Sequence, residues 1–337
     1  MIKCQKFYLP FPLKKKWVEL YRKGCYTPFQ SWLLNRLWFL VFGLKGTRRK
    51  FQPIFYFFKD DETDKRECIV PVLVNKKEKV LANYSQFGPI DYYDIIYSSD
   101  NDTFLGNCLN LLFKEYSGYV LNYENVPEES ILCKLLEGCE KKIAPCVRIE
   151  IQTLDYDDYY QALSKHQRQN LRTAYNKLQK ESKTFSVVKY DSENRIPRSV
   201  HKKCMKLYEE RCVMKNGGYR RVGFFSKLAA VKDSRTNLVN ILMLRGNNAV
   251  FVLYIDNAPA AYMVCFYDEH RPVVYVPRLV ANVEYLKYDP GILLLNEAIK
   301  SLLAEGIMIV DLTRGDEPYK KAMGGTVVNN YVFQKQL

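Results

Sequence analysis

The sequence predicts a mixed α/β protein whose sheet is mostly antiparallel and whose two halves are built alike. Short runs rich in β-branched and aromatic residues, such as PIFYFFK at 53–59, alternate with helical patterns along the 337 residues. Turn residues at 246–248 and at Asp256-Asn257 join three late runs as hairpins. A helical pattern at 290–305 between two further strands predicts one parallel crossover.

The first half is expected to hold strands, a helix, a strand and a second helix. Pro71 falls inside the second strand and lacks an N–H group, which predicts an edge strand or a bulge there. The expected elements are strands at 53–59, 68–74 and 79–84, an irregular piece at 87–97, a helix at 102–116, a strand at 119–123, and a helix opened by Pro127 that runs to about 136.

The second half is expected to begin with helices and to continue as an antiparallel meander and a strand–helix–strand unit. The expected elements are a strand within 145–155, helices at 156–182, 198–214 and 223–233, strands at 184–190, 238–245, 249–255, 258–267, 272–278, 307–312 and 327–333, the helix at 290–305, and a helical turn at 318–323. We therefore divide the chain into a basic segment at 1–50, a first half at 51–145 and a second half at 146–337.

Positive charge is concentrated at the start of the chain. The net charge is +14, and residues 1–50 hold twelve Lys or Arg but a single acid, Glu19. The remainder is close to neutral, which argues against a nucleic-acid-binding surface over the whole protein. A basic segment of this kind suits an anionic membrane surface.

The stretch WLLNRLWFLVFGL at 32–44 has two readings. It is too short for a spanning helix, which needs about 20 apolar residues, and it lacks the cleavage pattern of a signal peptide. It is either an interfacial helix on an anionic membrane surface or a buried helix of the first half.

The ten cysteines are scattered and form no CxxC pair. His201 and Cys204 have a metal-like spacing, but no second pair completes a site, so we expect no metal. Scattered cysteines in apolar surroundings indicate a reducing, cytoplasmic compartment.

Three stretches resemble a known family: LSKHQRQNLRTAYNKL at 163–178, YDPGILLLNEAIKSLLAEG at 288–306 and DLTRGDEPYKKAMGG at 311–325. They resemble GNAT-superfamily acyltransferases of the CelD-like group, which is linked to cellulose and exopolysaccharide gene clusters. That group is similar in architecture to the FemABX peptidyltransferases. The resemblance implies tandem GNAT-like domains, acetyl-CoA or another acyl-CoA as donor, and no metal.

An acyl-CoA donor carries a pyrophosphate, and a helix N-terminus suits this group. Pro290, Gly291 and Ile292 open such a helix, and Lys287 could add charge. The glycine-rich loop of ordinary GNAT proteins is absent here, and a plain helix cap is the alternative reading.

A basic helix provides a second candidate for donor binding. Arg168 and Arg172 share one of its faces and could clamp a diphosphate. A solvated helix face is the alternative reading for both arginines.

The resemblance also selects three residues for chemistry. Asp311 ends an apolar strand and could act as general base, or could hydrogen-bond Arg314 or the backbone. Tyr319 could protonate the departing thiolate. Lys320 could bind phosphate, or pair with Asp311 or Glu317.

These features predict an acyl-CoA-dependent N-acyltransferase, specifically an N-acetyltransferase, that acts on an amino sugar or a similar small or lipid-linked amine. We expect it in the cytoplasm, where residues 1–50 would contact an anionic membrane surface. One alternative is a FemX-like transferase that uses aminoacyl-tRNA, the one nucleic-acid partner we expect. Another is a double-GNAT scaffold without catalytic activity.

Overall fold

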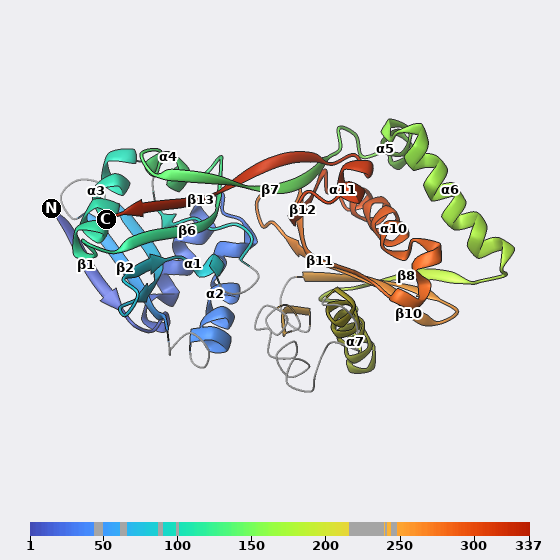
Figure 1. The fold of residues 1–337 in the computed structure, drawn as a ribbon, viewed down its shortest axis with the longest axis horizontal. Helices are drawn as coiled ribbons and strands as arrows, with labels where there is room; N and C mark the ends of the chain where they lie inside the picture. Colours follow the sequence, from blue (N-terminus) through green and yellow to red (C-terminus); the bar gives the residue numbers. More distant parts are fainter. Residues whose placement is uncertain are drawn as a thin grey trace. The chain divides into compact units, whose positions relative to one another are not determined.

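The chain folds into two compact units. The computed structural model describes residues 1–43, 50–60, 66–86, 90–98, 101–215, 239, 241–243 and 248–337. The first unit comprises Met1–Pro145 with Val328–Leu337, and the second comprises Cys146–Val327 (Figure 1). Each unit is mixed α/β with a mostly antiparallel sheet, which confirms the predicted fold class.

The first unit is a sheet covered by helices. Its strands follow the order β1-β2-β3-β4-β6-β13, with β5 paired to β3. Its elements are β1 (Ile2–Phe7), α1 (Lys14–Lys23), α2 (Trp32–Trp38), β2 (Gln52–Asp60), β3 (Glu67–Asn75), β4 (Val80–Ala82), β5 (Ile96–Tyr97), α3 (Asp102–Glu115), β6 (Val120–Pro127), α4 (Ile131–Leu135), the start of β7 (Glu140–Glu150) and the end of β13 (Thr326–Gln336).

Two neighbouring residues of β2 show how the helices are divided between the faces of this sheet. The ring of Phe55 contacts Trp17 of α1, whereas the hydroxyl of Tyr56 bonds Glu115 of α3 at 2.7 Å. Successive side chains of a strand point to opposite faces. Helices α1 and α3 therefore cover opposite faces.

The first 43 residues belong to the first unit and do not form a separate segment. Strand β1 pairs antiparallel with β2 along its whole length. The apolar stretch that begins at Trp32 is a buried helix, and Trp38 stacks on Tyr84 with ring centroids 3.8 Å apart. Of the two alternatives for this stretch, a membrane-interface helix and a buried helix, the buried helix is observed for residues 32–43. Leu44 lies outside the described residues.

Pro71 lies in an interior strand, contrary to the expected edge. Strand β3 pairs with β2 on one side and with both β4 and β5 on the other. The β5 pairing covers Cys68 and Ile69, and the β4 pairing starts at Leu73. Pro71 is tolerated because it sits between these two pairings, where its missing N–H group breaks no ladder.

The second unit is a sheet with helices on both faces. Its strands follow the order β7-β12-β11-β10-β9-β8. Its elements are α5 (Tyr156–Ala162), α6 (Lys165–Lys180), β8 (Phe185–Tyr190), α7 (Arg198–Lys215), β9 (Asn248–Ile255), β10 (Ala258–Tyr267), β11 (Val273–Ala281), α10 (Pro290–Ala304), β12 (Ile309–Arg314) and α11 (Pro318–Ala322), with the ends of β7 and β13.

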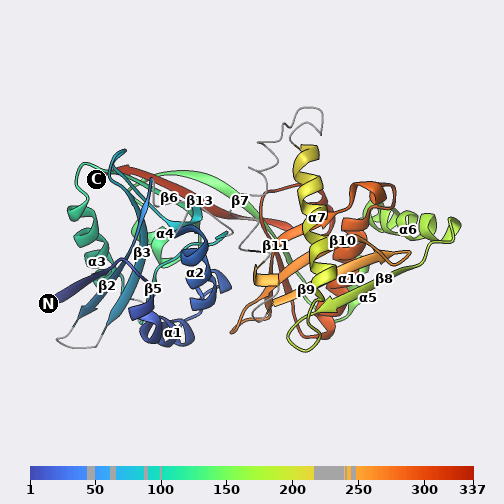
Figure 2. The same ribbon diagram turned by 90° about the horizontal axis from the view of Figure 1, so that it is seen from below.

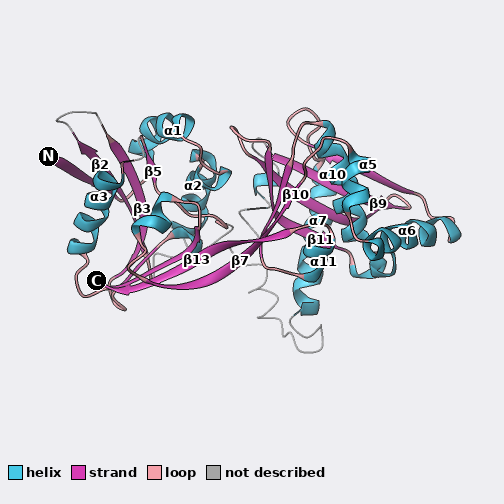
Figure 3. Ribbon diagram, turned by 90° about the horizontal axis from the view of Figure 1, so that it is seen from above, coloured by secondary structure: helices cyan, strands magenta, loops and turns pink. Residues whose placement is uncertain are grey.

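Helix α10 packs on one face of this sheet and α7 on the other (Figures 1 and 2). The core between α10 and the sheet includes Met263 and Cys265 of β10, which alternate with residues of the opposite face. Figure 3 shows the same ribbon coloured by secondary structure, with the strands in magenta and the helices in cyan. Tyr275 and Asp311, which belong to the site described below, alternate with residues of this core and therefore point away from α10.

Four sequence predictions need correction. Residues 328–337 group with the first unit because β13 pairs with β6. The helix expected at 156–182 breaks at Leu163, because Ser164 caps α6 through a bond from the Gln167 N–H group.

Helix α4 starts only after Ser130, whose side chain caps it. Pro127, which was expected to open that helix, ends β6 instead. Of the strand expected at 238–245, residues 239 and 241–243 are helical. The helix expected at 223–233 lies outside the described residues.

Candidate functional site

The central feature of the second unit is the point where two parallel strands part. Strands β11 and β12 pair only over Val273–Tyr275 and Ile309–Asp311. We call the end of this pairing, after Tyr275 and Asp311, the strand fork. In sheets of this kind, ligands bind at the carboxyl ends of parallel strands.

Two β-bulges bend the strands at the fork. In β11, Val276 and Pro277 together oppose one residue of β10. In β12, Leu312 and Thr313 together oppose one residue of β7. Because a bulge bends its strand and increases the local twist, the pair separates here.

Thr313 is strained in a way that points to function. Its φ of +53° is left-handed, which is an outlier for a β-branched residue. The conformation is held by a 2.8 Å bond from its N–H group to Asp311 Oδ1 and a 3.3 Å bond from its hydroxyl to the Val276 carbonyl. Strain that the surroundings enforce is concentrated at active sites and ligand clamps.

Asp311 is completely buried, and both of its oxygens are engaged. Oδ1 accepts the Thr313 N–H, and Oδ2 accepts Arg148 Nε of β7 at 3.3 Å. The bond to the backbone, one of the alternatives for Asp311, is therefore present, and Arg148 is an additional partner. This arrangement fits a residue that positions its neighbours.

Replacing Asp311 by asparagine is expected to lower the free energy of unfolding by about 2 kcal/mol. The amide keeps an acceptor for Thr313 but loses the charge that compensates Arg148. Thermal denaturation measures the change. The matched control is Asp316→Asn, at an exposed aspartate that pairs with Lys321 at 3.0 Å, and this variant should melt close to the wild type because water screens an exposed pair. Equal melting temperatures for the two variants would contradict the role given to Asp311.

Tyr275 extends the polar group at the fork. It lies beside Asp311 in the ladder, and its hydroxyl accepts a 2.9 Å bond from Arg271, which also pairs with Asp268 at 2.7 Å. Burial raises the pKa of Tyr275 well above its usual value, with Asp311 adding to the rise and Arg271 opposing it. The hydroxyl stays protonated and faces a cluster that includes two arginines.

Lys320 is buried and bonded to the chain itself. Its ammonium group donates to the carbonyls of Arg314 at 2.7 Å and Gly315 at 3.0 Å, and pairs with Glu317 at 2.9 Å. Of the expected partners, Glu317 is present. These contacts fix the loop from β12 to α11, in which Gly315 has a positive φ of +92°.

Tyr319 follows this loop on α11 and is partly buried against the core. Within the described part of the chain, its hydroxyl has no hydrogen-bond partner. Burial raises its pKa to about 12, with Glu317 adding to the rise and Arg211 of α7 opposing it. Tyr319 is therefore a neutral O–H donor at physiological pH.

The N-terminus of α10 follows β11, as the sequence predicted. Its cap residue, Asp289, is left-handed with φ +50°, and Pro290 occupies the first turn. Ile292 already donates to the Asp289 carbonyl at 3.0 Å. Among the described residues, the Gly291 N–H has no partner, so this helix end presents one free donor.

Lys287 precedes this helix end but is engaged elsewhere. Its ammonium group pairs with Glu181, the cap residue of α6, at 2.7 Å, and this bond raises its pKa. The Lys177 ammonium also donates to the Lys287 carbonyl at 3.1 Å. The carboxyl end of α6 thus lies at the start of α10.

Arg168 and Arg172 lie toward the other end of α6. Arg168 donates to the Leu163 carbonyl at 2.7 Å and to the Gln161 carbonyl, and so closes the end of α5. Arg172 is exposed and bonds Gln169 at 3.1 Å. Within the described residues, no hydrogen bond or ion pair joins either arginine to 290–292.

Sequence reasoning missed Arg148, Tyr275 and Arg271. Arg148 lies 163 residues before Asp311 in the chain, so no local pattern connects them. It also missed Arg278 of β11, a buried cation whose guanidinium lies 4.1 Å from the ring of Tyr208 of α7. The available signal was single arginines within apolar strands, where a charge needs a partner.

The first unit contains an equivalent parallel pair, but a side chain closes it. Strands β4 and β6 pair parallel from Val80 with Val120 to Ala82 with Asn122. Immediately afterwards, the buried Asn83 side chain donates to the Glu124 carbonyl at 2.7 Å and accepts its N–H at 3.2 Å. Because this amide replaces the missing ladder bonds, the second unit is the better candidate for ligand binding.

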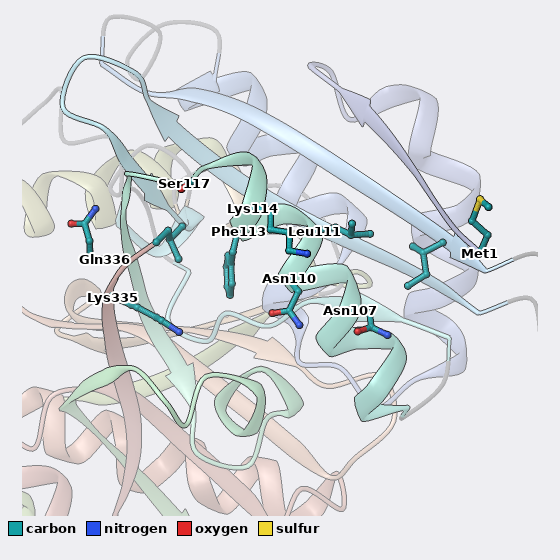
Figure 4. A pocket seen from close by; sticks show the side chains of 11 residues that line it. Met1, Asn107, Asn110, Leu111, Phe113, Lys114, Ser117, Lys335 and Gln336 are labelled. Carbon is teal, nitrogen blue, oxygen red and sulfur yellow. The ribbon is translucent and has the colours of Figure 1, made fainter.

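A pocket of about 840 Å³ lies in the first unit beside α3 and both chain ends (Figure 4). Asn107, Asn110 and Lys114 of α3 and Lys335 of β13 line part of it. It contains none of the predicted site residues. In the described part of the chain, no group of His, Cys, Asp and Glu side chains is arranged to hold a metal ion, and no helix has the length and apolarity to cross a membrane.

Comparisons with known proteins agree with this geometry. Residues 165–321 match the family model of the acetyltransferase (GNAT) domain. A search of the curated proteins finds no match.

Several solved structures share the fold over most of the chain. FemX is 9% identical, with a TM-score of 0.58 over 98% of both chains. A tandem GNAT protein from the clavulanic acid biosynthesis pathway is 9% identical, with a TM-score of 0.52 over 99% of this chain and 98% of that one.

A third structure, the C-terminal domain of a putative lysylphosphatidylglycerol synthetase from Agrobacterium fabrum, is 8% identical. Its TM-score is 0.52 over 80% of this chain and 81% of that one. The fold is therefore that of the GNAT superfamily. Since the similarity to the tandem GNAT protein extends over both units, the architecture is tandem.

Proposed function

We propose that the protein is an acyl-CoA-dependent N-acyltransferase that uses acetyl-CoA and acts on an amino sugar or a similar small or lipid-linked amine. The observation that carries this proposal is the strand fork of the second unit. There, a parallel pair is parted by two bulges, two non-glycine residues are left-handed, and the α10 N-terminus follows directly.

The donor would bind along this fork. The free Gly291 N–H and the positive end of the α10 dipole favour a pyrophosphate oxygen. The Lys287 ammonium would leave Glu181, pair with a phosphate of the donor and so add positive charge to the site. Beyond Tyr275 and Asp311, the backbone N–H and C=O groups of β11 and β12 no longer pair with each other. These groups could therefore hydrogen-bond the arm of the donor that carries the thioester, if this arm lies between the two strands.

Tyr319 is our candidate for the general acid. In the reaction, the amine attacks the thioester carbonyl, a C–N bond forms, and the C–S bond breaks. The Tyr319 hydroxyl would give its proton to the departing thiolate, and the proton of the amine would return to the tyrosinate through solvent. A pKa of about 12 keeps this hydroxyl protonated before each turnover.

Asp311 and Lys320 would act by positioning. Asp311 holds Arg148 and the strained Thr313 at the fork, and Lys320 holds the loop that carries Tyr319. The hydrogen bonds of Arg168 and Arg172 join them to residues of α5, α6 and the turn between these helices, which favours a structural role for both on the solvated face of α6. Arg172 is exposed, so a diphosphate bound near α6 could still reach it.

Substituting Gly291 by alanine tests the donor site. In the structure, an added Cβ would lie 3.7 Å from Ala281 Cβ, an ordinary contact, so the fold should tolerate it. A methyl group at the helix end would hinder the approach of a pyrophosphate, and we expect about tenfold weaker acetyl-CoA binding by calorimetry. Stability should stay equal or rise slightly, because alanine favours a helix.

The matched control is Gly106→Ala in α3, where the added Cβ would also make only an ordinary contact, 3.6 Å from Leu135. This variant should bind acetyl-CoA like the wild type. If the wild type shows no acetyl-CoA binding at millimolar concentration, the proposal fails.

The main alternative is an aminoacyl-tRNA-dependent transferase, which the similarity in fold to FemX favours. Binding of charged tRNA, without acetyl-CoA binding, would support it. A protein that binds neither would fit a double-GNAT scaffold.

A CelD-like role in cell-surface polysaccharide synthesis belongs to the same proposal. It rests on the motif at 311–325 and on the amine chemistry of the GNAT fold. We further propose a cytoplasmic location. All ten cysteines are free thiols, with Cys4 and Cys25 exposed, as suits a reducing compartment.

A further inference from the structure

The first unit exposes a compact basic surface on α1. Trp17, Leu20 and Tyr21 face the core, so the opposite face of the helix is presented to solvent. At i and i+7 on that face stand Lys15 and Arg22, both exposed. Lys14 is exposed at the start of the same helix.

These three cations are not neutralised. In the described part of the chain, no acid pairs with Lys14, Lys15 or Arg22. The only acid of the helix, Glu19, pairs with Lys23 at 2.8 Å and Lys16 at 3.5 Å. The α1 surface therefore keeps its positive charge.

Apolar side chains stand immediately before these cations. The segment that leads into α1 exposes Tyr8 (56%), Leu9 (46%) and Phe11 (43%). Phe11 is held in place by edge contacts to the rings of Trp32 and Phe39, at centroid distances of 6.5 and 5.9 Å. Three large apolar side chains exposed within four residues are more than the scattered exposure of an ordinary surface.

We propose that Tyr8, Leu9, Phe11, Lys14, Lys15 and Arg22 form a docking surface for an anionic lipid bilayer. The apolar tips enter the interface between headgroups and acyl chains, and the three cations lie at the level of the anionic headgroups. This inference goes beyond the proposed function and does not depend on it. The binding element is the surface of Tyr8–Arg22, since the more apolar stretch at 32–43 is buried.

The surface suits a bilayer better than a nucleic acid. Both partners attract cations, but a nucleic acid offers no apolar phase for an aliphatic side chain such as Leu9. Segments that bind at a membrane interface combine cationic side chains with nearby tyrosine and apolar side chains, as Tyr8, Leu9 and Phe11 are combined with the cations here.

The test uses co-sedimentation of the full chain with vesicles of phosphatidylcholine alone or of equal parts phosphatidylcholine and phosphatidylglycerol. We expect binding to the anionic vesicles only, and its loss at high salt. A Lys14→Ala/Lys15→Ala/Arg22→Ala variant should bind roughly 100-fold more weakly, because each cation near the surface contributes about fivefold. A Leu9→Ser/Phe11→Ser variant should lose about tenfold.

The matched control removes three exposed cations of the same unit, as Lys76→Ala/Lys77→Ala/Lys114→Ala. Its net charge equals that of the first variant, and it should bind nearly as the wild type does. Unchanged melting temperatures show that each variant is folded.

Three outcomes would overturn the proposal. They are no preference of the wild type for anionic vesicles, equal losses in both triple variants, and tRNA binding by the same cations without vesicle binding. The acetyl-CoA calorimetry described above is independent of all three, so this proposal and the proposed function can fail separately.

Discussion

Replacing Lys320 by methionine is expected to lower the free energy of unfolding by about 3 kcal/mol, because the ammonium group is buried and fully engaged. Methionine fills a similar volume but leaves the carbonyls of Arg314 and Gly315 without their donor. In a unit of this size, the melting temperature should fall by roughly 10 °C. Turnover should fall with it, since the loop that carries Tyr319 is released.

The neighbouring lysine provides the control. Lys321 is on the same helix, is half-exposed and pairs only with the exposed Asp316. Lys321→Met makes the same change in charge and shape, and should shift the free energy of unfolding by less than about 0.5 kcal/mol. If Lys320→Met melts like the wild type but loses turnover, Lys320 faces a ligand, and the positioning role is incorrect.

The sequence was sufficient for most elements because their signals are local. The turn at Asp256-Asn257 was expected from its residue types, and both residues are indeed left-handed, at φ +49° and +63°. The crossover from β11 through α10 to β12 followed from a proline-led helix between two apolar runs, and the parallel pairing confirms it.

One of the misses has a non-local cause. Residues 328–337 group with the first unit because β6, some two hundred positions earlier in the chain, offers a strand edge. The break at Leu163 and the late start of α4 are local, because the side chains of Ser164 and Ser130 cap the helices that follow them.

The candidate site shows the same limit. The motif at 311–325 selected a segment that lies at the strand fork, but it did not predict the contacts of its residues. Lys320 is one of several charged residues in the motif, and only the folded loop shows that four backbone or carboxylate oxygens surround it. Arg148 could not be found, because its link to Asp311 is made by β7 pairing with β12.

Tyr319 is the residue for which we expect the largest effect on catalysis. Replacing it by phenylalanine should lower kcat by roughly 100- to 10,000-fold, the usual contribution of a general acid. The change removes one hydroxyl that has no hydrogen-bond partner in the described residues, and the ring keeps its contacts with the core. The melting temperature should therefore stay within about 1 °C of the wild type.

The measurement is the release of thiol from acetyl-CoA with glucosamine as the amine, compared with calorimetric binding of acetyl-CoA. Binding should not change, because the hydroxyl acts only when the thiolate departs. Tyr160→Phe is the control, since it removes a half-buried hydroxyl of α5 that makes one long bond, of 3.4 Å, to the Arg168 carbonyl. It should keep wild-type turnover.

The pH profile separates an acid from a merely structural hydroxyl. With a pKa of about 12, Tyr319 stays protonated throughout the stable range, so the wild type should show no loss of kcat from this group below about pH 11. If thiolate protonation limits the rate, the slow Tyr319→Phe variant should instead lose kcat as pH rises, because it depends on acid from solvent. A variant with wild-type kcat and a flat profile would remove Tyr319 from the chemistry and leave the strand fork without a general acid.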